Sequence, residues 1–312
     1  MILRKIFNPV AVARYMRWEL AIAAFLSFGV YFLYHRRHLE HISLPFSVAA
    51  ILGSALAIFI AFRNNSSYSR WWEARTIWGG IVNSSRVLAR LIITFADSHS
   101  HQANYDAAKS AGFKKEMVYW VIAWVHALRL HLRKEDSWQV LQPFVPSDVY
   151  AQIAAAQHKP NMIQLMMGRR IYLAMADGTL GGFDSFQMEG QLLALANYQG
   201  GCERIKNTPL LRQYHFFTKL FLLVFMGILP FALIGDFSKM GMAWMMVPVS
   251  ILISFVFGVM GKVGEVNEDP FENRITDVPL TALCNTIERD LKEMLGEAEL
   301  PAKMEAVQGF LF

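Results

Sequence analysis

Four long apolar stretches constrain the fold of this chain more than any other feature of its sequence. They cover approximately residues 18–34, 42–62, 216–235 and 242–261. A helix needs about 20 predominantly apolar residues to cross the hydrocarbon core of a bilayer. Charged residues make up only 18% of the chain, whereas soluble domains carry about 25%. The sequence therefore predicts a membrane protein with four transmembrane helices, arranged as two hairpins.

The distribution of basic residues predicts how these spans are oriented. Polar segments 63–215 and 262–312 follow the second and fourth stretches, so an even number of spans puts both segments on the same side as the N-terminus. Basic residues precede the first stretch at Arg4, Lys5, Arg14 and Arg17. Loops rich in Lys and Arg stay in the cytoplasm. We therefore expect cytoplasmic termini, although Arg36 and Arg37 in the first outer loop favour the opposite orientation.

Helical periodicity continues into the polar segments. Apolar and small residues recur at helical spacing after the second span, at Trp71, Ala74, Trp78, Ile81, Ser85, Leu88, Ile92 and Phe95. Segment 117–128 has no formal charge but is too short to span, so we expect a buried helix there. We expect a loop over 97–113, a helix over 184–205 broken at Gly200-Gly201, and a helix beginning near Pro279. Because no β alternation is present, the chain 1–312 is predicted to be a single all-α unit.

The sequence shows no convincing catalytic set, and we expect neither an enzyme nor a cofactor. The histidines at 99, 101, 126 and 131 lack the ligand spacing of a metal motif, so no metal is predicted. Cys202 and Cys284 are expected to be reduced thiols. The net charge of +5 fits cytoplasmic Lys and Arg, and no nucleic-acid-binding pattern is present.

The spans themselves narrow the class of transporter. Ion-coupled carriers usually keep ionisable groups near the bilayer midplane. Here Glu19 and Lys219 lie near span ends, which disfavours a carrier. In the second span Ser54, Ile58 and Phe62 form one stripe, which fits either ordinary helix packing or an apolar constriction that ions cross. Spacing alone favours packing, and a pore would need several subunits around an axis.

Two segments resemble bestrophins, in particular the bacterial bestrophin-like group. They are "FRNNSSYSRWWEARTIWGGIVNSSR" at 62–86 and "EDPFENRITDVPL" at 268–280, and the resemblance covers about residues 5–295. It implies a homopentamer in the bacterial inner membrane, with a large helical cytosolic region and a central ion pore. It also implies a pore neck lined by Ser54, Ile58 and Phe62, of which Ser54 departs from the family's bulky apolar type.

The resemblance implies further site residues. A cytosolic aperture is expected at Phe186, with Asp184 and Glu189 close enough to attract cations. The Arg-Trp segment is expected to hold the second span to the cytosolic region through Arg70, Trp71, Trp72, Glu73, Arg75 and Trp78. In it, Arg70 and Glu73 have the spacing of a helical ion pair, and Trp71 and Trp72 suit a membrane interface. Arg75, Arg86 and Arg90 are expected between subunits.

The expected function is passive conduction of monovalent ions through a bilayer. Animal relatives bind calcium partly through acids after the fourth span, but here Asn273 and Arg274 replace two of them, which implies a calcium-independent channel. Repeated copies of Asp184 and Glu189 favour cations such as Na⁺ and K⁺. The alternatives are a chloride or other anion channel of the same architecture, a secondary carrier for small anions, and a non-conducting scaffold.

Overall fold

The computed structural model describes residues 1–3, 9–36, 39–103 and 105–312. Arg4, Lys5 and Arg37, on which part of the predicted orientation depends, lie outside these residues. The described residues form helices joined by turns, and their β pairing is confined to isolated bridges near the two ends of the chain. The prediction of an all-α protein is confirmed.

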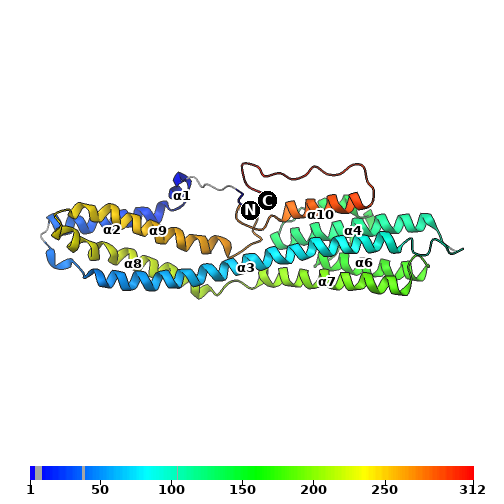
Figure 1. Ribbon diagram of the computed structural model, residues 1–312, viewed down its shortest axis with the longest axis horizontal. Coiled ribbons are helices and arrows are strands. Elements are labelled where there is room, and N and C mark those ends of the chain that lie inside the picture. Colours follow the sequence, from blue (N-terminus) through cyan, green and yellow to red (C-terminus); the bar gives the residue numbers. More distant parts are fainter. Residues whose placement is uncertain (4–8, 37–38, 104) are drawn as a thin grey trace. The chain divides into compact units, whose positions relative to one another are not determined.

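The contacts divide the chain into two compact units. The membrane unit consists of Arg4–Arg70 and Pro209–Glu268. The bundle unit consists of Met1–Leu3, Trp71–Thr208 and Asp269–Phe312. The division falls inside α3, a continuous helix of 50 residues over Phe46–Phe95 (Figure 1). The first part of α3 therefore belongs to the membrane unit and its second part to the bundle unit.

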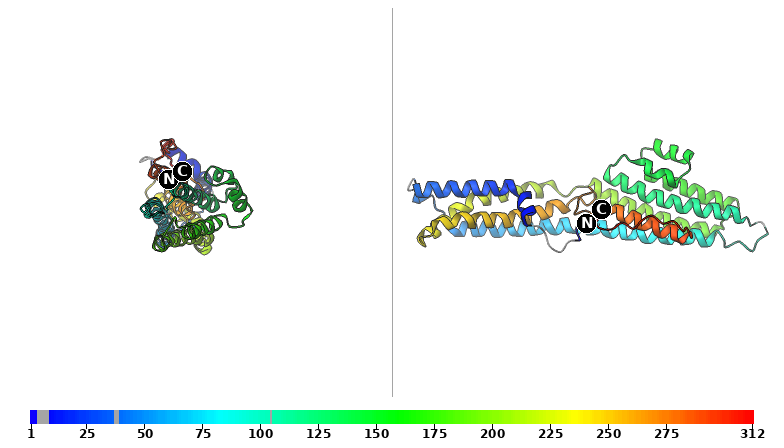
Figure 2. Two further views of the ribbon diagram at one scale, coloured as in Figure 1. Left: turned by 90° about the vertical axis from the view of Figure 1, so that its right-hand side faces the viewer. Right: turned by 90° about the horizontal axis from the view of Figure 1, so that it is seen from above.

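The membrane unit contains the apolar helices that the sequence predicts. Among the described residues, four helices are long and apolar enough to cross a membrane. Figures 1 and 2 show them side by side within this unit. They are α2 (Arg17–Arg36), the first part of α3, α8 (Arg212–Lys239) and α9 (Met246–Asn267), accompanied by α1 (Pro9–Tyr15), η1 (Glu40–Ile42) and η3 (Ala243–Met245). The second span begins at Phe46 rather than residue 42, because 40–42 form a separate 3₁₀ turn.

Small residues on α9 allow close helix packing in the membrane unit. Gly258, Gly261 and Gly264 are all buried. A Cβ atom added at Gly264 would stand 2.2 Å from Oδ1 of Asn64 on α3. The side-chain amide of Asn64 also donates a hydrogen bond to the carbonyl oxygen of Met260 at 2.9 Å. Small residues permit this kind of close approach between membrane helices. Gly264 therefore sets the distance between α3 and α9 at this level.

We expect Gly264→Ala to destabilise the protein by about 1–3 kcal/mol, because the added methyl group overpacks against Asn64. Gly261→Ala is the matched control on the same helix, since a Cβ there meets nothing within 4 Å. Thermal unfolding of both variants in detergent checks the prediction. Equal midpoints for the two variants would contradict the close contact at Gly264.

The bundle unit is built around α4. Its helices are the second part of α3, α4 (Ala107–Arg133), α5 (Ser147–Ala155), α6 (Lys159–Ala176), α7 (Gly182–Asn207) and α10 (Leu280–Met294), with η2 (Trp138–Phe144). Nearly every residue of α4 from Met117 to Leu130 is buried. Segment 117–128 is thus a buried helix of this unit, as predicted. The predicted stripe on α3 from Ala74 to Ile92 faces the same core.

Two local predictions were wrong. The loop predicted over 97–113 is shorter, because the Asp106 carboxylate accepts hydrogen bonds from the backbone N–H groups of Ala108 and Lys109 and so begins α4 at Ala107. The break predicted at Gly200-Gly201 is absent, and both glycines lie inside α7. A Cβ at Gly201 would stand 2.9 Å from Cδ1 of Ile77, so this glycine permits close packing of α7 on α3.

The two ends of the chain lie together in the bundle unit (Figure 1). The backbone N–H of Leu3 donates to the carbonyl oxygen of Gly309 at 2.9 Å, and Ile2 forms an antiparallel bridge with Phe310. The N–H of Ala282 on α10 donates to the carbonyl oxygen of Phe312 at 2.7 Å. The described residues at the two ends therefore belong to one unit.

Candidate ion pathway

The predicted neck residues form an exposed stripe on α3 in the membrane unit. Ile58 is 59% exposed and Phe62 is 65% exposed, and Ser54 is exposed on the same face. The opposite face of the helix is buried against the rest of this unit through Leu56 and Ile60. The stripe is therefore available to lipid or to another copy of the chain.

A buried arginine fixes the rotation of α3 directly beside Phe62. Arg63 is 2% exposed, and its Nη2 donates to Oε2 of Glu268 at 3.1 Å. Nη2 also lies 2.9 Å from Nδ1 of His215, and Nη1 lies 3.5 Å from the carbonyl oxygen of Gly261. Because Arg63 is held on the inner face by α8 and α9, Phe62 must face outward.

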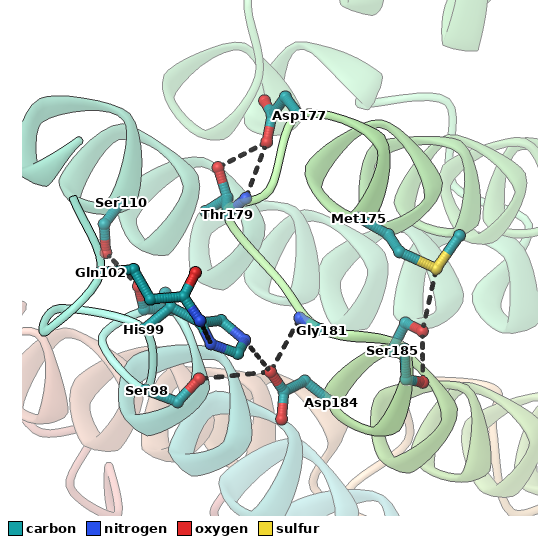
Figure 3. Close-up of polar contacts among 12 residues, drawn as sticks. Ser98, His99, Gln102, Ser110, Met175, Asp177, Thr179, Gly181, Asp184 and Ser185 are labelled. Carbon is teal, nitrogen blue, oxygen red and sulfur yellow. Dashed lines mark hydrogen bonds and ion pairs between the residues drawn. The ribbon is translucent and has the colours of Figure 1, made fainter. Parts of the chain in front are cut away.

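The start of α7 carries the predicted aperture residue. Phe186 is 73% exposed, whereas the neighbouring Asp184 is buried at 8%. Oδ2 of Asp184 accepts hydrogen bonds from the backbone N–H of Gly181 at 2.9 Å and from the Ser98 hydroxyl at 3.3 Å (Figure 3). Asp184 therefore serves to cap α7, and its carboxylate is buried and held by donors of the protein itself.

His99 adds a further contact to this cap. Its Nε2 lies 3.2 Å from Oδ2 of Asp184, and its Nδ1 lies 3.2 Å from Nε2 of Gln102 (Figure 3). The amide of Gln102 can only donate to Nδ1 through its nitrogen, so the proton of the neutral ring belongs on Nε2 and is donated to Asp184. A Cβ at Gly181 would stand 3.0 Å from Nε2 of His99, so glycine permits this approach. The loop after α3 thereby holds the start of α7 in place.

Glu189 lies apart from this cap. It is exposed and, one turn and a half after Asp184, borders a shallow groove between α6 and α7 of about 370 Å³. Of the two acids expected to attract cations, only Glu189 therefore keeps a solvent-facing carboxylate.

The Arg-Trp segment packs into the bundle unit. The indole N–H of Trp71 donates to the carbonyl oxygen of Thr276 at 3.0 Å, and Trp78 is fully buried. Glu73 forms an ion pair with Arg204 of α7. Trp72 is 56% exposed, and Arg75 lies beside Gly79 on the same helix. Trp71, Glu73 and Trp78 therefore attach this part of α3 to the bundle unit, while Arg70 ends the membrane unit.

Arg86, which we expect between subunits, has a partner within its own chain. Its Nε and Nη2 donate to Oδ2 of Asp290 on α10, at 2.9 Å and 2.5 Å. The pair is largely exposed and joins α3 to α10 in the bundle unit.

Three acids after α9 bind groups of the protein itself. Glu268 accepts from Arg63, and Glu272 pairs with Nζ of Lys206 at 2.5 Å. Asp277 accepts from the backbone N–H groups of Glu272 at 2.7 Å and Arg274 at 3.1 Å. Burial raises the pKa of the Asp277 carboxyl. These carboxylates are therefore occupied by internal donors.

Sequence reasoning missed Arg63, His215 and His99 as positioning residues. Arg63 was interpreted only as the first residue of the polar segment 63–215, although it is the residue next to Phe62 and so faces another side of the helix. The signal that could have found it is Glu268, one of the acids that follow the last span at the same membrane boundary.

The fold and the exposed stripe define a class: a four-span helical membrane protein with a separate helical bundle. The sequence profile described as "Bacterial/Fungal Bestrophin protein" matches residues 6–293. The chain therefore belongs to the bestrophin family, whose members are ion channels and not enzymes.

Named relatives agree with this assignment. The chain is 34% identical over 267 residues to "Voltage-dependent anion channel-forming protein YneE" of Escherichia coli K12, covering 85% of this chain and 82% of that protein. It is 30% identical to "Voltage-dependent anion channel-forming protein RSc3414" of Ralstonia nicotianae, over 82% of this chain and 78% of the relative. A crystal structure of a bacterial bestrophin homolog from Klebsiella pneumoniae superposes with a TM-score of 0.80 at 32% identity, covering 91% of this chain and all of that one (100%).

Proposed function

We propose that this chain forms a passive, anion-conducting homopentameric channel in the bacterial inner membrane, with both ends of the chain in the cytoplasm. The observation that carries the proposal is the exposed stripe of Ser54, Ile58 and Phe62, which the buried Arg63 turns away from the body of its own membrane unit. An apolar stripe on one protomer becomes an apolar ring when copies close around an axis.

The neck formed by these rings would control conduction by its width. Ions crossing apolar rings lose part of their hydration, and narrow hydrophobic constrictions gate by dewetting. Phe62 forms the bulkiest ring. Ser54 forms the smallest, and its hydroxyl donates to the carbonyl oxygen of Ala50 at 2.8 Å within its own helix. We infer that the Ser54 ring is the widest part of the neck and the Phe62 ring the narrowest.

The sequence led us to expect cation selectivity, but the comparisons do not support that expectation. We therefore propose anion selectivity in its place. Several relatives are named as anion channel-forming proteins. In addition, Asp184, one of the two acids behind the cation expectation, is buried and hydrogen-bonded. Of the two acids, only Glu189 still supports cation selectivity.

We also propose that conduction does not require calcium. Calcium sites need several oxygen ligands, usually including carboxylates. In this chain Glu268 binds Arg63, and Asp277 binds backbone N–H groups. A guanidinium group thus already neutralises Glu268, the first acid after α9.

Reversal potentials test the proposal. In planar bilayers under a KCl gradient without added calcium, we expect unitary currents that reverse near the chloride equilibrium potential. Glu189→Gln should leave this reversal potential unchanged, because the carboxylate does not set an anion preference. A wild-type current that reverses near the potassium equilibrium potential, and moves towards zero in Glu189→Gln, would overturn the proposed anion selectivity. The proposal that the protein is a channel would still stand. Saturating flux without unitary steps would favour a carrier.

A further inference from the structure

Three side chains that can ligate a metal ion meet in the bundle unit. His131 lies in the last turn of α4, His158 caps the start of α6, and Glu203 lies on α7. Oε1 of Glu203 is 3.0 Å from Nε2 of His158 and 4.0 Å from Nε2 of His131. One ligand atom from each residue lies within 4.8 Å of the others. The fold therefore brings together two imidazoles and a carboxylate from three helices.

The cluster opens into a water-accessible cavity. The cavity has a volume of about 570 Å³, and all three residues line it. Their side chains are 24–34% exposed, so an ion can reach them and water can complete its coordination shell. The remaining lining residues include Lys134, Glu135, Asp136, Trp138 and Lys206.

Two of the basic residues near the cluster have other partners. Lys206 pairs with Glu272, and Nζ of Lys159 lies 4.8 Å above the ring of Trp138 and donates to the carbonyl oxygen of Ala156. Burial, together with His158, lowers the pKa of His131. A neutral imidazole offers the lone pair that a metal needs.

A second layer of hydrogen bonds holds the carboxylate in position. Nε2 of Gln199 donates to Oε1 of Glu203 at 2.8 Å, and the indole N–H of Trp124 donates to Oε1 of Gln199 at 3.1 Å. Both Gln199 and Trp124 are buried. Supporting contacts of this kind orient ligands and tune the affinity of metal sites.

We propose that His131, His158 and Glu203 bind one transition-metal dication of the zinc class. Two histidines and one carboxylate, with a fourth position left for water, form a ligand set that zinc commonly takes. The site lies wholly within the bundle unit and does not depend on the proposed channel function.

Binding requires a proton rearrangement at His158. Nδ1 of this ring accepts a hydrogen bond from the backbone N–H of Asn161 at 3.3 Å, so without metal the Nε2–H donates to Glu203. A metal can bind Nε2 only when the proton has left this nitrogen. The ring stays neutral because its one proton then lies on Nδ1. The N–H of Asn161 loses its acceptor, so metal binding releases the cap of α6.

Zinc binding to the full-length protein, purified without a polyhistidine tag, tests the site. Isothermal titration with Zn²⁺ should give one ion per chain, and Co²⁺ should give the ligand-field spectrum of a site with nitrogen ligands. Amide exchange at Asn161 should become faster when Zn²⁺ is bound. His158→Asn and Glu203→Gln should each weaken Zn²⁺ binding by at least about 100-fold, the upper end of what losing a supporting contact produces.

The variants are chosen to keep the fold. Asn is a favourable N-cap residue, so His158→Asn removes the metal ligand but keeps an acceptor at the start of α6. Gln at position 203 keeps an acceptor for Gln199. His101→Gln, at an exposed loop histidine, is the matched control and should bind Zn²⁺ like the wild type. The proposal is overturned if the wild type takes up no stoichiometric Zn²⁺, or if the ligand variants bind it as tightly as His101→Gln does.

Discussion

Phe62→Ala is expected to raise the single-channel conductance about tenfold. The substitution widens the narrowest apolar ring of the proposed neck, and a barrier lowered by about 1.4 kcal/mol corresponds to a tenfold faster passage. Phe62 is 65% exposed on its own chain, so its truncation leaves the packing of the membrane unit intact. Single-channel recording in planar bilayers measures the effect.

Phe59→Ala is the matched control for this experiment. Phe59 lies on the same helix, but its ring packs against Tyr214 and Phe221 at centroid distances of 5.5 Å and 5.7 Å. Its truncation should lower stability without raising conductance. If Phe59→Ala opens the channel as Phe62→Ala does, the exposed stripe is not the constriction. Silence in both the wild type and Phe62→Ala would instead support a scaffold.

Arg63→Met is expected to destabilise the membrane unit by roughly 3–5 kcal/mol, the usual effect of removing one partner from a buried ion pair. The variant leaves Glu268 without its cation and Nδ1 of His215 without its donor. Thermal unfolding in detergent, followed by size-exclusion chromatography, measures the loss.

Two comparisons separate this buried network from an ordinary ion pair. Arg86→Met removes an arginine from the exposed pair with Asp290 and should have an effect of about 0–1 kcal/mol. The double variant Arg63→Met/Glu268→Gln should recover part of the stability, because the uncompensated charge is gone. Similar losses for Arg63→Met and Arg86→Met would show that Arg63 does not stabilise the unit.

The parts of the fold that depend on local periodicity could be predicted from the sequence. The apolar stretches are long because a bilayer is thick, and the stripe on α3 repeats because a helix turns every 3.6 residues. Both signals are local, because each can be found within a single short stretch of the sequence. The proposal that Ile58 and Phe62 line a pore depends on the family resemblance as well. Periodicity alone does not distinguish an exposed helix face that lines a pore from one that contacts lipid.

The electrostatic partners could not be predicted, because they are distant in the sequence. Asp184 was expected to attract ions, yet the loop before α4 supplies Ser98 and His99 to bind it. His131 was set aside as a metal ligand because no second ligand follows it at helical spacing. Its neighbours are instead His158 and Glu203, which the packing of α6 and α7 against α4 brings to it. Such pairings follow from tertiary packing and leave no local pattern.

The way the chain is divided between its two units has a consequence for biosynthesis. The bundle unit is assembled from 1–3, 71–208 and 269–312, and the last two of these are separated by α8 and α9 of the membrane unit. Contacts between such distant segments form slowly, because a long loop must close first. On a ribosome, α10 emerges only after the apolar helices have been synthesised. The bundle unit therefore completes its core only after α8 and α9 have been synthesised, and until then the surface of α4 that α10 covers stays unfilled.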